Sequence, residues 1–255
     1  MANGPAFDEA ARNAATLPDL SVGCHVVLID GVPVLDPAKL PSCTASERFR
    51  DGLTTFAARA VAGQMNPSEI EAEATAQITK IQSAGIRVSH VDTHKHTHLF
   101  PQILRPLLRA AQSCGVRALR NPFGPRFPLR SSELLRRPGL WKRWIEVQIL
   151  HRFAGQFRRT VDREGFATPN GTLGIEVTGA LDETLFRAIA QSIPDGTWEF
   201  VCHPGYNDAD LAAAKTRLRE SRETELGVLT LPAAREVIAD EGIQLISYHD
   251  LATAM

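Results

Sequence analysis

The stretch IRVSHVDTHKHTHLFPQILRPLLRAAQSCG, residues 86–115, joins an apolar β-rich run to a helical pattern through a histidine-rich segment. The run IRVSHVD (86–92) is typical of a strand. The following PQILRPLLRAAQSCG (101–115) has apolar residues at helical spacing and stops at Gly115, a suitable end for a helix. A strand that leads directly into a helix is the repeating unit of parallel α/β folds. The stretch therefore predicts one βα unit.

The same alternation of strand and helix patterns runs along the rest of the chain. Helical patterns occupy residues 68–85 and 231–242, which end at Gly85 and Gly242. The predicted strands are LSVGCHVVLI (20–29), IRVSHVD (86–92), VRALR (116–120), TWEFVCH (197–203) and IQLISYH (243–249). Alternation of this kind favours parallel strands joined by crossover helices. We predict a single α/β domain over residues 1–255, a (β/α) barrel-like fold of distorted TIM type, with an open sheet as the alternative.

Composition excludes several classes of protein. A chain of 255 residues with 44% hydrophobic content can bury a full core, and its formal net charge of −1 gives no global attraction to nucleic acid. The four cysteines are far apart in sequence, with no CxxC pair, which indicates reduced thiols. No signal-peptide pattern and no apolar run of about 20 residues is present. We therefore expect a cytoplasmic protein without a nucleic-acid partner.

Four of the eight histidines lie within nine positions of the segment HVDTHKHTHLFP (90–101). They are His90, His94, His96 and His98, and Asp92 lies among them. Imidazole and carboxylate groups together are usual ligands of divalent transition metals. The cluster therefore favours a metal site over its alternatives, a histidine-rich surface loop or a set of hydrogen-bonded barrel histidines.

Three histidines lie where predicted strands end. His25 is in GCHVVL, His94 follows HVDT, and His203 is in CHPGYND. Active sites of α/β folds are built at the C-terminal ends of strands. An extended segment would place Asp92 and His94 on one face, whereas a helical turn after residue 93 would make His94 and His98 neighbours. Either geometry brings candidate ligands together.

The motifs GxHxxL, HxDxHxHxHxFP and CHPGYxD, in this order, resemble those of the YdjC-like (ChbG-type) carbohydrate deacetylase family. Members of that family remove N-acetyl groups from sugars. The resemblance covers essentially the whole chain. Within the family, DGVPVLDPAKLP (30–41) and ERFRDG (47–52) most resemble the branch associated with hopanoid biosynthesis, which implies an N-acetylglucosaminyl hopanoid as substrate.

The resemblance implies a role for several residues. It makes His25 and His94 ligands of one divalent metal ion, Mg²⁺ or Zn²⁺, which would activate water for attack on an amide. We assign catalytic roles to His203, as the acid that protonates the departing amine, and to Asp92, which would orient a histidine or contact substrate. A histidine that merely caps a strand end is the alternative for His203. The residues predicted to contact the substrate are His98 and Arg120.

The chain departs from the family pattern at its beginning. Family members open with a strand that ends in an Asp-Asp pair and continues into a helix, whereas MANGPAFDEAARNA (1–14) corresponds to the segment that comes next. We expect that about 35 residues, one strand and its crossover helix, are missing. In the family those aspartates supply the third metal ligand and the general base. The metal site is therefore expected to be incomplete, and activity of this chain is in question.

A basic, aromatic segment lies in the middle of the chain. Between residues 117 and 163 there are twelve Lys or Arg and three acidic residues, and aromatic side chains are interleaved over 134–161. Such a pattern is typical of a solvated outer helix of the barrel and also of a helix that lies on a membrane surface, with RNA binding as a third option. The lipid-linked substrate that the resemblance implies leads us to predict peripheral membrane contact. The expected partners are an N-acetylated sugar or glycolipid and, as one option, a second copy of the chain.

Two other functions compete with the deacetylase. The triplet HKH (94–96) imitates the HxH motif of amidohydrolase-type barrel hydrolases, although the metal-bridging lysine of those enzymes is not evident. The expected loss of the first strand also leaves room for a protein that binds metal or carbohydrate without catalysis.

Overall fold

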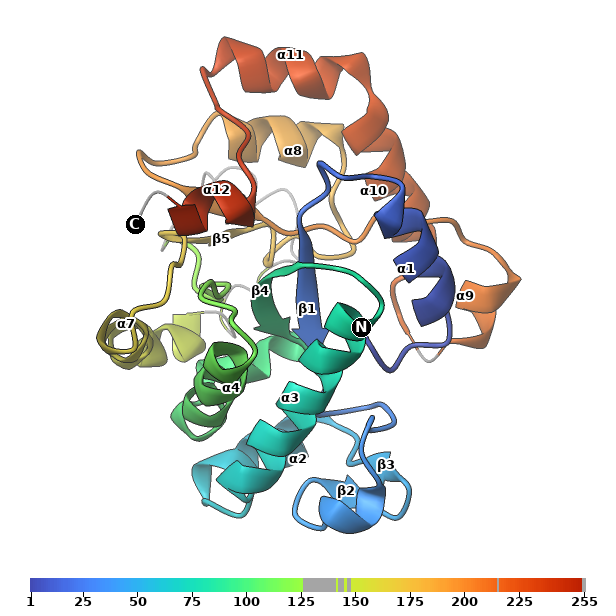
Figure 1. Cartoon of the computed structure of the whole chain (residues 1–255). Coiled ribbons are helices and arrows are strands. Elements are labelled where there is room, and N and C mark those ends of the chain that lie inside the picture. The colour runs from blue at the N-terminus through green and yellow to red at the C-terminus, as the bar shows by residue number, and fades with distance from the viewer. Residues whose placement is uncertain (126–140, 142–144, 146–147, 215, 254–255) are drawn as a thin grey trace. The chain divides into compact units, whose positions relative to one another are not determined.

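The computed structural model describes residues 1–125, 141, 145, 148–214 and 216–253. The chain divides into two compact units. The first unit comprises Met1–Arg120, Phe153–Thr168 and Ser247–Met255, and the second comprises Asn121–Arg152 and Pro169–Ile246. Both units contain helices and parallel strand pairs (Figure 1), which confirms the predicted mixed α/β class.

The first unit is built on two parallel strands, β1 (Val22–Val26) and β4 (Val88–Thr93). Their register places His25 opposite Asp92. The sheet is extended by isolated parallel bridges, from Val91 to Leu119 and from Ala118 to Ala167. Segments far apart in the sequence thus meet beside β4, and the carboxyl ends of β1 and β4 lie at the same edge.

Two helices that pack against each other cover this sheet, α3 (Pro67–Ser83) and α4 (Pro101–Ser113). The helix α3 begins where the Asn66 side chain accepts a hydrogen bond from the backbone N–H of Ser68, at 3.0 Å. It ends before Gly85, whose φ of +80° is the left-handed conformation that glycine adopts most easily. Apolar side chains at helical spacing are buried between the helices and the strands, among them Ile70, Ala74, Ile78, Ile103, Leu107 and Ala111.

Short elements complete the first unit. They are α1 (Phe7–Ala15), the 3₁₀ turn η1 (Pro37–Lys39), the antiparallel pair β2 (Thr44–Ala45) and β3 (Arg48–Phe49), α2 (Leu53–Val61), the irregular turn η2 (His94–Leu99), α7 (Ala154–Arg163) and α12 (Tyr248–Thr253). The 3₁₀ turn η3 (His151–Phe153) precedes α7 at the boundary between the units.

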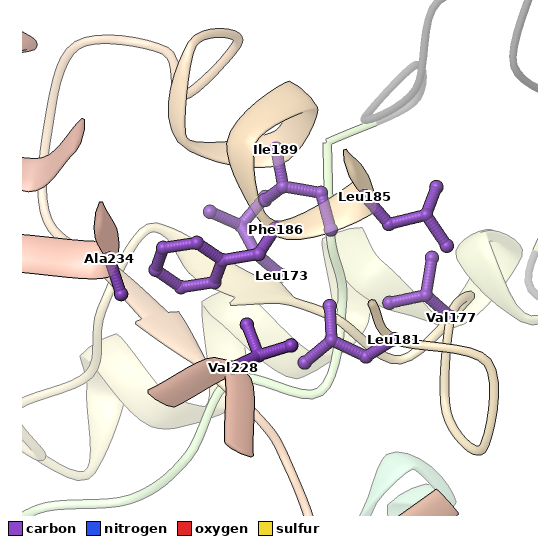
Figure 2. Packing of buried hydrophobic residues seen from close by; sticks show 8 residues of the cluster. All are labelled: Leu173, Val177, Leu181, Leu185, Phe186, Ile189, Val228 and Ala234. Carbon is purple, nitrogen blue, oxygen red and sulfur yellow. The ribbon is translucent and has the colours of Figure 1, made fainter. Parts of the chain in front are cut away.

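The second unit contains the parallel pair β5 (Gly171–Leu173) and β6 (Trp198–Phe200). Its helices are α8 (Glu183–Ala190), α9 (Ala209–Ala213), α10 (Glu220–Thr230) and α11 (Pro232–Asp240). Figure 2 shows the core of this unit, where Phe186 and its neighbours on α8 face Val228 of α10 and Ala234 of α11. This apolar cluster holds the three helices together.

The predicted helices are all present, whereas the predicted strands are only partly so. The strands expected over 20–29, 86–92 and 197–203 appear as β1, β4 and β6, and residues 116–120 contribute only bridges. The strand expected over 243–249 is wrong. Within the described residues it has no strand partner, Leu245 is 75% exposed, and the chain becomes helical at Tyr248. A strand needs a neighbour for its backbone groups, and propensity alone does not supply one.

The same limits apply to the expected barrel. Within the described part of the chain the strands form three separate two-stranded sheets, and no closed barrel is present. The barrel-like fold of TIM type is therefore not confirmed, and the single domain stays a prediction.

Candidate functional site

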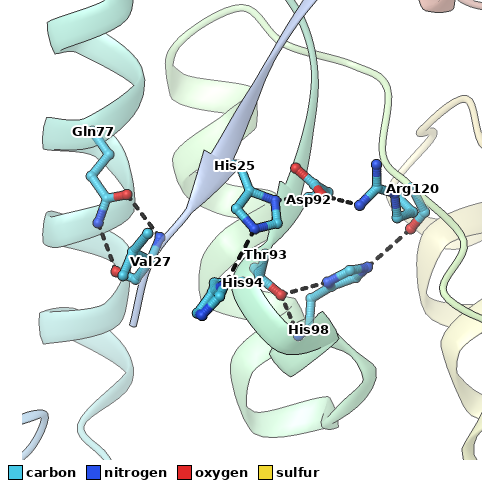
Figure 3. A network of polar contacts seen from close by, with 8 residues as sticks. All are labelled: His25, Val27, Gln77, Asp92, Thr93, His94, His98 and Arg120. Atoms are coloured by element: carbon cyan, nitrogen blue, oxygen red, sulfur yellow. Dashed lines mark hydrogen bonds and ion pairs between the residues drawn. The ribbon is translucent and has the colours of Figure 1, made fainter. Parts of the chain in front are cut away.

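The parallel register of β1 and β4 brings His25, Asp92 and His94 together at the ends of the two strands (Figure 3). Nδ1 of His25 lies 2.7 Å from a carboxylate oxygen of Asp92, and Nε2 of His25 lies 3.4 Å from Nδ1 of His94. Because the ionised carboxylate can only accept, it fixes the proton of His25 on Nδ1. When the His25 ring carries a single proton, its lone pair is therefore on Nε2, which faces His94.

Asp92 is buried between two cationic or potentially cationic groups. The same carboxylate oxygen that contacts His25 pairs with the Arg120 guanidinium, and Asp92 is only 3% exposed. Burial raises the pKa of Asp92, but the charges of His25 and Arg120 outweigh burial and hold that pKa well below its usual range. Asp92 is therefore a carboxylate at neutral pH.

His98 is enclosed beside this group. Its Nδ1 lies 2.7 Å from the hydroxyl of Thr93, and its Nε2 lies 3.1 Å from the carbonyl oxygen of Arg120. The side chain is fully buried, and burial lowers the pKa of His98 to about 4. Its neutral ring donates from Nε2 to the carbonyl of Arg120 and so steadies the residue that pairs with Asp92. The predicted contact between His98 and substrate stays a prediction.

The histidine-rich segment itself has an unusual backbone. Lys95 and His96 have φ values of +56° and +53°, which non-glycine residues seldom adopt, and η2 is kinked there. An ion pair between Lys95 and Asp30 joins this turn to the segment after β1, and Asp30 also has a positive φ, of +60°. Nδ1 of His96 is buried without a hydrogen-bond partner among the described residues. Strain of this kind concentrates at functional sites.

The remaining histidine of the cluster is not placed with the others. The ring of His90 stacks on Tyr248 of α12, with ring centres 3.7 Å apart, and its Nδ1 lies 2.9 Å from the Ser89 hydroxyl. A side chain at Gly23 on β1 would collide with the His90 ring. Within the histidine-rich segment, Asp92 and His94 thus contact His25, whereas His90 packs elsewhere, against Tyr248.

The pair His25 and His94 fits a divalent metal in its chemistry. A metal-binding histidine must be neutral, and burial lowers the pKa of His94 to about 4. A carboxylate behind the far nitrogen of a ligating imidazole, as Asp92 stands behind His25, is the usual support of such a ligand. Among the residues that the structure describes, no group of three or more His, Cys, Asp or Glu side chains is arranged around a single metal position. His25 and His94 therefore offer a metal two imidazole ligands.

Sequence reasoning missed the polar residues of α3. Gln77 and Glu73 are fully buried, and Figure 3 shows Gln77 bonded to Val27, two residues beyond His25. The detectable signal is their spacing: Glu69, Glu73 and Gln77 recur every four residues beside the apolar positions that predicted the helix. Polar residues at such positions need partners, because a buried unpaired polar group is costly.

His203 belongs to the second unit, in the segment after β6. Its backbone N–H donates to the carboxylate of Glu225 on α10, a residue only 1% exposed. The same segment is tied to α10 by the N–H of Gly205, which donates to the Arg222 carbonyl at 3.2 Å. The backbone around His203 is therefore held by a buried carboxylate, and its predicted acid role stays a prediction.

Part of the basic segment 134–161 lies outside the described residues. In its described part, Phe157 of α7 is buried near the His98 ring, whereas Arg158 and Arg159 are exposed. For α7 this is the pattern of an outer helix with a solvated basic face. Trp141 and Ile145 are exposed by 40% and 49%. No helix in the described part of the chain is both long and apolar enough to cross a bilayer.

Comparison with known proteins identifies relatives along nearly the whole chain. The family described as YdjC-like protein matches residues 1–240. A carbohydrate deacetylase of Brevibacillus brevis is 29% identical over 252 residues, which cover 98% of this chain and 86% of the relative. A carbohydrate deacetylase of Geobacillus stearothermophilus is 30% identical over 251 residues, which cover 98% of this chain and 84% of the relative.

The fold also has a solved counterpart. A crystal structure from Enterococcus faecalis V583, described as a candidate cellobiose-phosphate cleavage protein, superimposes with a TM-score of 0.74 and 23% sequence identity. The superposition covers 99% of this chain and 86% of that protein. At this identity the similarity establishes the fold alone.

Proposed function

The chain belongs to the YdjC-like protein family, and on that premise we propose that it is a carbohydrate deacetylase, a hydrolase that removes the N-acetyl group from an N-acetylated sugar. The support comes from relatives of this name that align with 98% of the chain. The observation that carries the proposal is the group of His25, Asp92 and His94 at the ends of two parallel strands. The family match favours this function over the amidohydrolase alternative.

We propose further that His25 and His94 hold one divalent cation, Mg²⁺ or Zn²⁺. When bound, such an ion polarises the amide carbonyl and lowers the pKa of a bound water toward about 7. Asp92 keeps the proton of His25 on Nδ1, so that Nε2 offers its lone pair. Arg120 shares the carboxylate of Asp92 and keeps that charge compensated inside the protein. These contacts prepare the two histidines before substrate arrives.

The remaining steps of amide hydrolysis need a proton donor and contacts to the sugar. We assign protonation of the departing sugar amine to His203, which moves one proton to nitrogen as the carbon–nitrogen bond breaks. The guanidinium of Arg120, largely but not fully buried, is the candidate for a contact with the substrate. His98 supports it from behind through the carbonyl of Arg120.

We propose the exact substrate from sequence similarity. The segments 30–41 and 47–52 resemble the hopanoid-associated branch, which favours an N-acetylhexosamine attached to a lipid over a soluble chitooligosaccharide. Peripheral membrane contact through residues 134–161 and a homodimer belong to the same proposal.

The test measures acetate release and metal binding in the same samples. Purified protein is stripped with a chelator, titrated with Zn²⁺ or Co²⁺ by calorimetry, and supplied with N-acetylglucosamine oligomers or an N-acetylglucosaminyl lipid. His25→Ala and His94→Ala should each weaken metal binding by orders of magnitude, because even residues behind the ligands contribute about 10- to 100-fold. His249→Ala, which changes a histidine of α12, is the matched control and should bind metal normally.

Two results would count against the proposal. Release of acetate at the same rate by the parent protein and by both variants would remove His25 and His94 from the chemistry. A parent protein that binds metal or sugar without releasing acetate from either substrate would instead support the alternative of a binding protein without catalysis.

A further inference from the structure

One face of α3 binds the backbone of the chain that follows β1. Glu69, Glu73 and Gln77 are spaced by four residues and share that face. The carboxylate of Glu73 accepts hydrogen bonds from the backbone N–H groups of Val34 and Leu35, at 2.8 and 3.0 Å. Glu69 accepts from the N–H and the hydroxyl of Ser42, each at 2.8 Å. Side chains of α3 therefore accept hydrogen bonds from the segment after β1, which has few strand partners of its own.

Gln77 makes the contact nearest to the candidate site. Its side-chain oxygen accepts from the N–H of Val27 at 2.9 Å, and its side-chain nitrogen donates to the carbonyl of Val27 at 2.8 Å. The same nitrogen donates to Glu73, also at 2.8 Å. Because a carboxylate accepts and does not donate, Glu73 fixes which end of the Gln77 amide faces which group of Val27. The contact thus has one orientation.

Gln77 continues the support that β4 gives to β1. The pairing of the two strands ends with Val26 opposite Thr93, and Val27 is the next residue. Val27 is buried, so loss of Gln77 would take a partner from both its N–H and its carbonyl in an apolar environment. A shift of the backbone at Val27 moves His25, two residues earlier, whose Nδ1 must stay within hydrogen-bond reach of Asp92.

We propose that Gln77 is a positioning residue for His25, and that it acts through the backbone of Val27. The inference rests on the proposed function for the statement that His25 binds a metal. The placement of His25 against Asp92 does not depend on that statement, because it is a feature of the protein alone. The two parts can therefore be tested separately.

The experiment compares Gln77→Met with Gln82→Met. Gln82 lies on the same helix and also donates a side-chain hydrogen bond to a backbone carbonyl, that of the half-buried Cys114, at 2.8 Å. Methionine keeps the length of glutamine and its helix propensity but makes no such bond. Two quantities are measured in each protein: the exchange-protected N–H resonance of the His25 ring in metal-free protein by ¹⁵N NMR, and the affinity for Co²⁺ by calorimetry.

Gln77→Met should lose or broaden the His25 N–H resonance and weaken Co²⁺ binding by about 10- to 100-fold, the usual range for residues that support a metal ligand. Gln82→Met should change neither. Equal behaviour of the two variants would overturn the inference, because it would reduce Gln77 to one stabilising hydrogen bond among others.

Two complications have defined consequences. A parent protein that binds no Co²⁺ would contradict the proposed metal site, and the NMR comparison would then decide the role of Gln77 by itself. If Gln77→Met does not fold, Gln77→Glu replaces it, since glutamate still accepts from Val27 N–H but cannot donate to its carbonyl. An unchanged His25 resonance in that variant would overturn the inference, and a lost one would support it.

Discussion

Replacing Asp92 by Asn should be among the most damaging isosteric substitutions in the first unit. The carboxylate of Asp92 is shared by the Nδ1–H of His25 and the guanidinium of Arg120, and it is 3% exposed. An amide of the same shape keeps one accepting oxygen but carries no charge and presents an NH₂ group among donors. The Arg120 charge would then be left without its carboxylate.

The expected magnitude follows from that burial. Removing one partner of a buried ion pair costs about 3–5 kcal/mol, whereas exposed ion pairs contribute about 0–1 kcal/mol. Because the pKa of Asp92 lies well below its usual range, its stabilising charge is fully present at neutral pH. Asp92→Asn should therefore lower the free energy of unfolding by about 3 kcal/mol or more, and metal affinity by about 10- to 100-fold through His25.

The assay is urea unfolding at pH 7 in the presence of a chelator, with Asp30→Asn as the control. Asp30 also forms an ion pair, with Lys95, but those side chains are 21% and 39% exposed. Asparagine also tolerates the positive φ of Asp30, so that variant should lose at most about 1 kcal/mol. If the two variants lose equal stability, the argument from a shared, buried carboxylate is refuted.

Three further predictions concern other parts of the chain. His203→Ala should lower kcat by about 10²- to 10⁴-fold with little change in KM, and an unchanged kcat would leave His203 a structural residue. Burial lowers the pKa of His96 to about 3 and of His98 to about 4. Below about pH 6.5 the unfolded chain therefore binds more protons than the folded protein does. The free energy of unfolding of the metal-free protein should thus be highest above that pH and fall toward pH 4, by on the order of 3 kcal/mol per histidine. Denaturant titrations that give the same free energy of unfolding at pH 7 and pH 5 would contradict this. Through residues 134–161 the protein should sediment with anionic but not with neutral liposomes, and salt should release it. If the protein still binds after Arg136, Arg137, Lys142 and Arg143 are replaced by Gln, the basic segment is not the membrane contact.

Much of the candidate site could be predicted because its residues carry local signals. His25 lies within one strand pattern and His94 follows another, and parallel strands bring their carboxyl ends to one edge, so the placement of both near that edge follows from the class of fold. Asp92 was predicted to orient a histidine or to contact substrate, and in the structure it holds His25. The helices were predictable for the same reason, since apolar spacing and a closing glycine lie within one segment.

Other features depend on partners that no local pattern names. The run 243–249 has the composition of a strand, yet it lies exposed without a strand partner among the described residues. His90, His96 and His98 look alike in sequence, but one stacks on Tyr248, one has a strained backbone, and one is enclosed by Thr93 and Arg120. The sequence by itself determined the βα units and marked His25, Asp92 and His94 as residues of the strand ends, because periodicity and strand direction are local properties, whereas the pairing of β1 with β4 brought the three together. Only the tertiary structure decided that Gln77 holds Val27 and that Arg120 shares Asp92, because these bonds join residues 28 to 50 positions apart whose buried polar groups must find partners.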